Sequence, residues 1–221
     1  MSTDKIKLDK NWHPESAPDR LTALSDGIFS VSLTLAAVEI MPPELGHRLA
    51  VEGVMKVLHE LAPSLIGVAM NFFLVSNYWV AHHRIFTYVR RIDYAFIMRN
   101  MLFLMFITFM PFAIKVQFSG DTAAAVSFYS GFMAFTGLLL IWVWDNATRK
   151  HRLVDPKLDP RVIRYGYVRS VIGIAIYLVA IGVAQFSPKG AQFTWCLFFF
   201  HRRLAEYVVG SKPDEAINAA S

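Results

Sequence analysis

Long apolar stretches alternate with shorter polar ones along the 221 residues of the chain. A helix that crosses a bilayer needs about 20 mostly apolar residues. Stretches free of Asp, Glu, Lys and Arg occur at 61–83, 122–144 and 170–188. Two more, 21–41 and 94–114, are apolar apart from a few charged positions. The pattern predicts an all-α membrane protein in which these five segments are transmembrane helices.

A sixth candidate, 191–209, has a shorter apolar part that is followed by His201, Arg202 and Arg203. We predict a sixth transmembrane helix here, and an amphipathic helix on the membrane surface is the alternative. The predicted organisation is a polar cytoplasmic N-terminal segment (1–19), a six-helix domain (20–209) and a disordered cytoplasmic tail (210–221). Segment 1–19 lacks the short apolar run of a signal peptide.

The basic residues are distributed unequally between the two sides of this six-helix arrangement. Eighteen of the 22 Lys and Arg fall on the side of the N-terminus, and the other side holds only Arg48, Lys56, Lys115 and Lys189. Cytoplasmic loops of membrane proteins carry an excess of Lys and Arg. The asymmetry predicts a cytoplasmic N-terminus. The net charge of +5 then reflects the excess of basic residues on the cytoplasmic side of a membrane protein, and it gives no reason to expect a nucleic-acid partner.

Composition narrows the function classes further. Hydrophobic residues make up 55% and charged residues 18%, whereas soluble domains have about 45–50% and 25%. These values exclude a disordered chain and argue against a soluble enzyme. The single cysteine, Cys196, excludes an intrachain disulfide and a cysteine-based zinc cluster, and the adjacent His82 and His83 diverge by about 100° on a helix. We therefore expect no metal, no cofactor and no enzymatic activity.

The first predicted helix is unusually polar for a transmembrane segment. It carries Ser25, Asp26, Ser30, Ser32, Thr34 and Glu39. Polar groups at membrane depth usually face protein or water, because burying them in lipid is costly. We expect this helix to lie inside the bundle or along a pore.

Helical geometry places several residues of this segment on one face. At about 100° per residue, Leu35 lies near +40° from Val31, Val38 near −20°, Gly27 near −40° and Thr34 near −60°. The face is an aliphatic stripe with one hydroxyl at its flank. Periodicity alone leaves two interpretations open: close helix packing, which small residues permit, or the wall of a pore.

A second set of polar residues lies at the predicted inner ends of the first two transmembrane helices. Trp79 and His82 are three residues apart and share a face, at the depth of Asp26. We predict a polar clamp between helices, formed by Arg20, Ser25, Asp26, Trp79 and His82.

The third transmembrane helix contains two further features. Asn100 either forms a hydrogen bond across helices or lies at the membrane interface, and Pro111 is expected to kink the helix near its outer end.

Three of these motifs resemble those of one family. Arg20-x-x-x-Leu24-Ser25-Asp26 is similar to the Arg-x-x-x-Phe-Ser-Asp signature of the transmembrane protein 175 family, the endosomal/lysosomal potassium channels, with Leu24 in place of the usual Phe. The run Trp79-x-x-His82-His83-Arg84-Ile85-Phe86 resembles the end of that family's second helix. Asn100 with Pro111-Phe112 resembles its third helix.

The resemblance implies a potassium-selective cation channel without a carbonyl filter, in which the first helix lines a central pore. Its prokaryotic members have a single six-helix repeat and form homotetramers, which implies a multi-pass protein of a prokaryotic plasma membrane. Carried onto this chain, the pore constriction falls at Val31, with further aliphatic rings at Leu35 and Val38. The hydroxyls that favour potassium ions fall at Thr34 and Ser30.

Other classes of function stay open on the sequence alone. A proton-coupled secondary transporter would use Asp26 and His82 as proton sites, and its flux would saturate and follow a proton gradient. A membrane enzyme lacks a convincing arrangement of nucleophile and base. An assembly scaffold would pass no ions.

Overall fold

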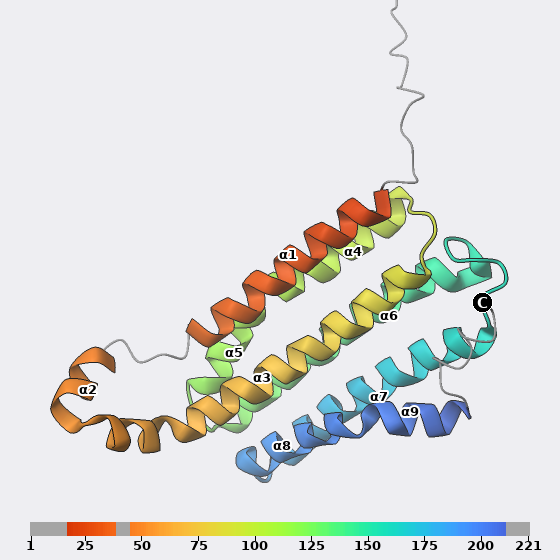
Figure 1. The fold of residues 1–221 in the computed structure, drawn as a ribbon. Helices are drawn as coiled ribbons and strands as arrows, with labels where there is room; N and C mark the ends of the chain where they lie inside the picture. Colours follow the sequence, from red (N-terminus) through yellow and green to blue (C-terminus); the bar gives the residue numbers. More distant parts are fainter. Residues whose placement is uncertain (1–16, 39–44, 211–221) are drawn as a thin grey trace, which may run out of the picture.

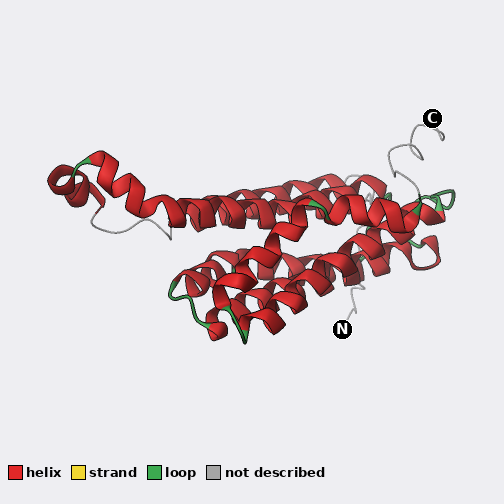
Figure 2. Ribbon diagram, turned by 90° about the horizontal axis from the view of Figure 1, so that it is seen from below, coloured by secondary structure: helices red, strands yellow, loops and turns green. Residues whose placement is uncertain are grey.

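A computed structural model describes residues 17–38 and 45–210, and every regular element in these ranges is helical (Figures 1 and 2). The helices are α1 (Ala17–Val38), α2 (Leu45–Glu52), α3 (Val54–Tyr88), α4 (Tyr94–Thr108), α5 (Met110–Phe118), α6 (Ala123–Thr148), α7 (Pro160–Ala184), α8 (Pro188–Thr194) and α9 (His201–Val209). Two 3₁₀ helices, η2 (Arg149–His151) and η3 (Trp195–Phe199), complete the set. The all-α prediction is confirmed.

Four helical stretches in the described ranges are long and apolar enough to cross a membrane: Val54–Tyr88, Tyr94–Phe118, Ala123–His151 and Pro160–Ala184. They correspond to the predicted segments 61–83, 94–114, 122–144 and 170–188. The six-helix count and the cytoplasmic N-terminus stay predictions. Residues 211–221 of the predicted tail and 1–16 of the predicted N-terminal segment lie outside the described residues.

The ends of the helices follow local chemistry. Asp93, Thr122 and Asp159 precede α4, α6 and α7, and their side chains accept hydrogen bonds from backbone N–H groups of the first turn. Such capping satisfies donors that have no partner inside the helix. Helix α3 begins at Val54, seven residues before the predicted segment 61–83. The prediction began later because it counted only positions without charge, and the first turns of α3 carry charged residues.

The third predicted transmembrane helix is interrupted, as Pro111 requires. Helix α4 ends at Thr108, and α5 begins at Met110 with the proline in its first turn. A proline has no N–H for the carbonyl four residues earlier, which here is the carbonyl of Ile107. Ser32 of α1 donates a hydrogen bond to that carbonyl instead.

The segment 191–209 is helical but is not one continuous α-helix. It is divided among α8, η3 and α9, and all three pack against α7. On α9, His201 and Ala205 are buried, whereas Arg202, Arg203 and Tyr207 are exposed. The basic, exposed face belongs to α9 alone, and all three pieces lie along α7 (Figure 1), so the sixth crossing stays a prediction.

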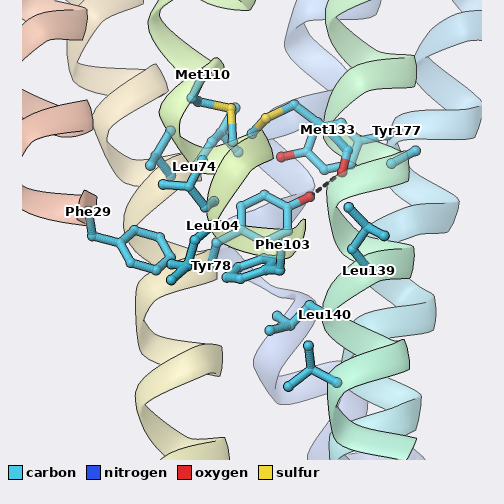
Figure 3. Close-up of a cluster of buried hydrophobic side chains, with 14 of the residues drawn as sticks. Phe29, Leu74, Tyr78, Phe103, Leu104, Met110, Met133, Leu139, Leu140 and Tyr177 are labelled. Carbon is cyan, nitrogen blue, oxygen red and sulfur yellow. Dashed lines mark hydrogen bonds between the residues drawn. The ribbon is translucent and has the colours of Figure 1, made fainter. Parts of the chain in front are cut away.

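Helix α6 lies at the centre of the bundle and packs against α4, α5 and α7. Figure 3 shows apolar side chains of α3, α4 and α6 meeting around Tyr78, whose hydroxyl donates to the carbonyl of Met133. Helix α1 lies at one edge of the bundle against α3, α4 and α5, and α7 to α9 form the opposite edge (Figure 1). The two edges therefore expose different surfaces.

Close packing between α6 and α7 depends on a glycine and generates a testable prediction. A Cβ atom on Gly166 would lie 2.5 Å from Nε1 of Trp144, a buried side chain that donates to the carbonyl of Ile163. We expect Gly166→Ala to lower the free energy of unfolding by about 1–3 kcal/mol, because the added methyl group would overlap the indole ring of Trp144 and force it to move.

Thermal unfolding of the purified protein measures this effect. Gly182→Ala on the same helix is the control, since nothing lies within 4 Å of the added Cβ there. Equal unfolding temperatures for the two variants would contradict the packing argument.

Candidate functional site

Helix α1 has one face that is buried against the bundle. Leu21, Ser25, Phe29 and Ser32 repeat at helical spacing and are at most 7% exposed. The Phe29 ring lies against the ring of Phe103 on α4, at 6.0 Å between centroids. The apolar part of this face is thus packed, and its two serines must find hydrogen-bond partners inside the protein.

Both serines form hydrogen bonds with residues of α4. Asn100 donates from Nδ2 to Oγ of Ser25 at 3.3 Å, and its Oδ1 lies 2.8 Å from Nε2 of His82 on α3. An amide oxygen only accepts hydrogen bonds, so Nε2 of His82 carries the proton. Ser32 donates to the carbonyl of Ile107, as described above. The resulting chain of contacts joins α1, α3 and α4 through groups that are almost fully buried.

A second polar contact lies beside this chain. Nε1 of Trp79 on α3 donates to Oδ1 of Asp26 on α1 at 2.9 Å. Trp79 is 37% exposed, so this bond lies at the edge of the interface rather than inside it. The carboxylate accepts a charge-assisted hydrogen bond, which is stronger than one between neutral groups.

The structure places the predicted clamp residues in two groups. Asp26 is bonded to Trp79, whereas Ser25 and His82 are joined through Asn100. Arg20 is exposed, and no hydrogen bond or ion pair connects it to the described part of this cluster. Of the two alternatives for Asn100, the structure shows the interhelical hydrogen bond. The contact of Ser32 was not predicted from the sequence, and its signal was Pro111, four residues after Ile107.

The opposite face of α1 is left exposed by residues 17–38 and 45–210. Val31 is 57% exposed, Leu35 47% and Val38 62%, and Ser30 and Thr34 are exposed as well. A groove of about 450 Å³ runs along this face, lined by Ala23, Leu24, Gly27, Ile28, Val31, Ser32 and Leu35, with Thr108 from α4. Of the positions that share one side of the helical wheel, Gly27, Val31 and Leu35 line this groove.

The hydroxyl of Thr34 is held in place by its own helix. It lies 2.9 Å from the carbonyl of Val31 and 3.1 Å from that of Ser30. Since the hydroxyl proton is used inward, the oxygen lone pairs stay available on the exposed face. Such an oxygen suits a cation or a water molecule. No group of three or more His, Cys, Asp or Glu in the described ranges could hold a metal ion.

Fold and surface together define an all-helical membrane protein with a polar-edged aliphatic stripe along one helix, as expected of an ion channel rather than an enzyme. The model of the family "Endosomal/lysosomal potassium channel TMEM175" matches residues 20–111. A potassium channel of Chamaesiphon minutus is 31% identical over 193 residues, which cover 84% of this chain and 94% of that protein. The chain belongs to the TMEM175 family.

Two further comparisons agree with this assignment. The crystal structure of a lysosomal potassium-selective channel TMEM175 homolog from Chamaesiphon minutus superposes with a TM-score of 0.69 at 26% identity, covering 86% of this chain and 98% of that one. The human endosomal/lysosomal proton channel TMEM175 is 24% identical over 159 residues, 71% of this chain and 31% of that protein. The chain is therefore a multi-pass membrane protein of an ion-channel family, and its bacterial relative agrees with a prokaryotic membrane.

The interhelical chain of hydrogen bonds generates a second prediction. We expect Asn100→Leu to lower the free energy of unfolding by about 1–3 kcal/mol, because Nε2 of the buried His82 loses its acceptor. Thr108→Val on the same helix is the control, since Thr108 is exposed and bonds only to its own helix. Chemical denaturation of both variants measures the difference, and equal midpoints would contradict the role of Asn100.

Proposed function

We propose that the chain is a potassium-permeable cation channel whose pore is lined by α1. The observation that carries this proposal is the division of α1 into two faces. One face is fixed to α3, α4 and α5 by packing and by buried hydrogen bonds, and the other presents aliphatic and hydroxyl groups that the described residues leave exposed.

A homotetramer gives this free face a function. Four copies around an axis place four Val31 side chains at one level, with rings of Leu35 and Val38 one and two turns further along. Aliphatic rings narrow and dry a pore, so an ion must lose water to pass. Lipid contact alone explains the stripe less well, because Ser30 and Thr34 share its surface and would gain nothing from hydrocarbon.

Hydroxyl oxygens beside the constriction supply the preference for potassium. A potassium ion loses its hydration shell more readily than a sodium ion, and the oxygens of Thr34 and Ser30 replace part of that shell. The sequence has no Thr-Val-Gly-Tyr-Gly segment, which forms the carbonyl filter of other potassium channels. A tilt or rotation of α1 would move the rings and open the pore.

The proposed topology follows from lengths and charges. A helix of the length of α1, 22 residues, spans about 33 Å at 1.5 Å per residue, enough for the hydrocarbon core. With α1 and the segment 191–209 as additional crossings, the chain has six crossings and both termini in the cytoplasm, the side with 18 of the 22 basic residues.

The contacts of Asp26 and His82 favour a clamp over proton sites of a secondary transporter. Asp26 accepts from Trp79, and His82 donates to Asn100. Neither side chain bonds to the other, and both hold α1 in place. A proton-coupled transporter would need a path for protons between Asp26 and His82. Their separate hydrogen bonds, to Trp79 and to Asn100, support a role in holding the helices together instead.

A test of the constriction uses the purified protein in liposomes with a potassium gradient. Val31→Leu is expected to reduce the potassium current severalfold because a larger side chain narrows the ring, and Val31→Asn is expected to raise it by wetting the pore. Val179→Leu on α7 changes an equally exposed valine and should leave the current unchanged. An unchanged or larger current in Val31→Leu would contradict the constriction, and flux that saturates and follows a proton gradient would favour a transporter.

A test of the hydroxyls compares ion selectivity. Thr34→Ala is expected to lower the permeability ratio of potassium to sodium, because one ring of oxygens is lost. Thr87→Ala on α3 is the matched control, since Thr87 is also exposed and bonds to its own helix. Reversal potentials under mixed-ion conditions measure the ratio. The same ratio in Thr34→Ala and wild type would remove Thr34 from the selectivity mechanism.

A further inference from the structure

A buried arginine lies far from α1, on the opposite side of the bundle. Arg169 of α7 is 8% exposed. Its Nε donates to Nε2 of His201 on α9 at 3.2 Å. Nδ1 of His201 is bonded to the carbonyl of Phe198, so His201 is neutral with its proton on Nδ1 and cannot balance the charge.

No acidic side chain in the described ranges pairs with Arg169. The ionisable side chains that act on it are Tyr165, Arg84 and Arg202, and the two arginines are positive as well. The nearest carboxylate on α9, that of Glu206, is bonded to Arg202 at 2.9 Å. Burying a charge without a counter-charge is costly, so the site requires an anion or its equivalent.

The remaining N–H groups of Arg169 have space for such a group. A guanidinium has five N–H donors, and among the described residues an acceptor is found for the one on Nε. Arg169 lines two adjoining cavities of about 40 and 30 Å³ between α3, α6 and α7. Both are also lined by Ser170, Ala81 and Leu140, and Arg84 lines the second. Each cavity holds a few water-sized groups, which is the scale of phosphate oxygens.

The surroundings identify the source of the anion. The cavities lie along membrane-spanning helices and are lined by Ile174 and Phe198 in one direction and by Arg84 and Tyr88 in the other. Such a mixture suits a lipid, with a phosphate at the basic end and a chain along the apolar end. Basic pockets between transmembrane helices on the cytoplasmic side bind anionic headgroups in this way.

We propose that the crevice between α3, α6 and α7 binds the phosphate group of an anionic lipid through Arg169, with Ser170 as a second donor. Arg84 adds positive charge at the rim, where its guanidinium lies 5.1 Å from the centroid of the Tyr165 ring. The lipid fills the gap between α3 and α7 and supplies the missing negative charge. This site is independent of the proposed pore, which uses the opposite edge of the bundle.

The experiment is thermal unfolding of the full-length protein in a neutral detergent, titrated with short-chain phosphatidylglycerol or with phosphatidylcholine of the same chains. Phosphatidylglycerol should raise the unfolding temperature saturably, with a half-saturating concentration at least about tenfold lower than that of phosphatidylcholine. Arg169→Gln should raise the phosphatidylglycerol value about tenfold, the loss of about 1.4 kcal/mol expected for a charge-assisted contact.

Two controls keep the test decisive. Arg164→Gln changes the same charge on the same helix at an exposed position and should bind phosphatidylglycerol like wild type. Ala81→Leu fills both cavities without changing charge and should weaken binding even if Arg169→Gln fails to fold.

Three results would overturn the proposal. They are equal stabilisation by both lipids, wild-type binding in Arg169→Gln or in Ala81→Leu, and stabilisation by inorganic phosphate alone that matches phosphatidylglycerol, which would assign the site to a free anion.

Discussion

The docking of one face of α1 onto α3, α4 and α5 is the constraint on which the rest of the structure depends. Three polar contacts set its rotation: Trp79 to Asp26, Asn100 to Ser25, and Ser32 to the carbonyl of Ile107, to which Pro111 cannot donate. A rotation of α1 by one residue would break all three together. Because these bonds are directional and mostly buried, the stripe that contains Val31 is held outward as firmly as the serines are held inward.

The sequence predicted most of the helices but not their ends. Apolar length identified the four longest spans because the bilayer requires it, whereas the early start of α3 and the short α2 lie outside that requirement. The division of 191–209 into three pieces was not predictable from hydropathy, since local 3₁₀ geometry depends on packing against α7.

Part of the candidate site could also be predicted from the sequence. Helical periodicity places Val31, Leu35 and Val38 on one face without any knowledge of neighbours, because it depends only on the geometry of one helix. Partners across helices are not encoded in this way. Arg20 was expected in the clamp, where no hydrogen bond joins it to the other described members, and Asn100 links Ser25 and His82. The uncompensated charge of Arg169 was invisible in the sequence, because only the fold shows which residues surround it.

The central claim is that the free face of α1 borders the ion path, and cysteine accessibility tests it most directly. Val31→Cys in a Cys196→Ser background would be labelled with a charged, water-soluble thiol reagent while potassium flux through liposomes is recorded. The account predicts that labelling blocks flux at position 31 and leaves it unchanged for Val179→Cys in the same background. Full labelling of Val31→Cys with undiminished flux would contradict the account.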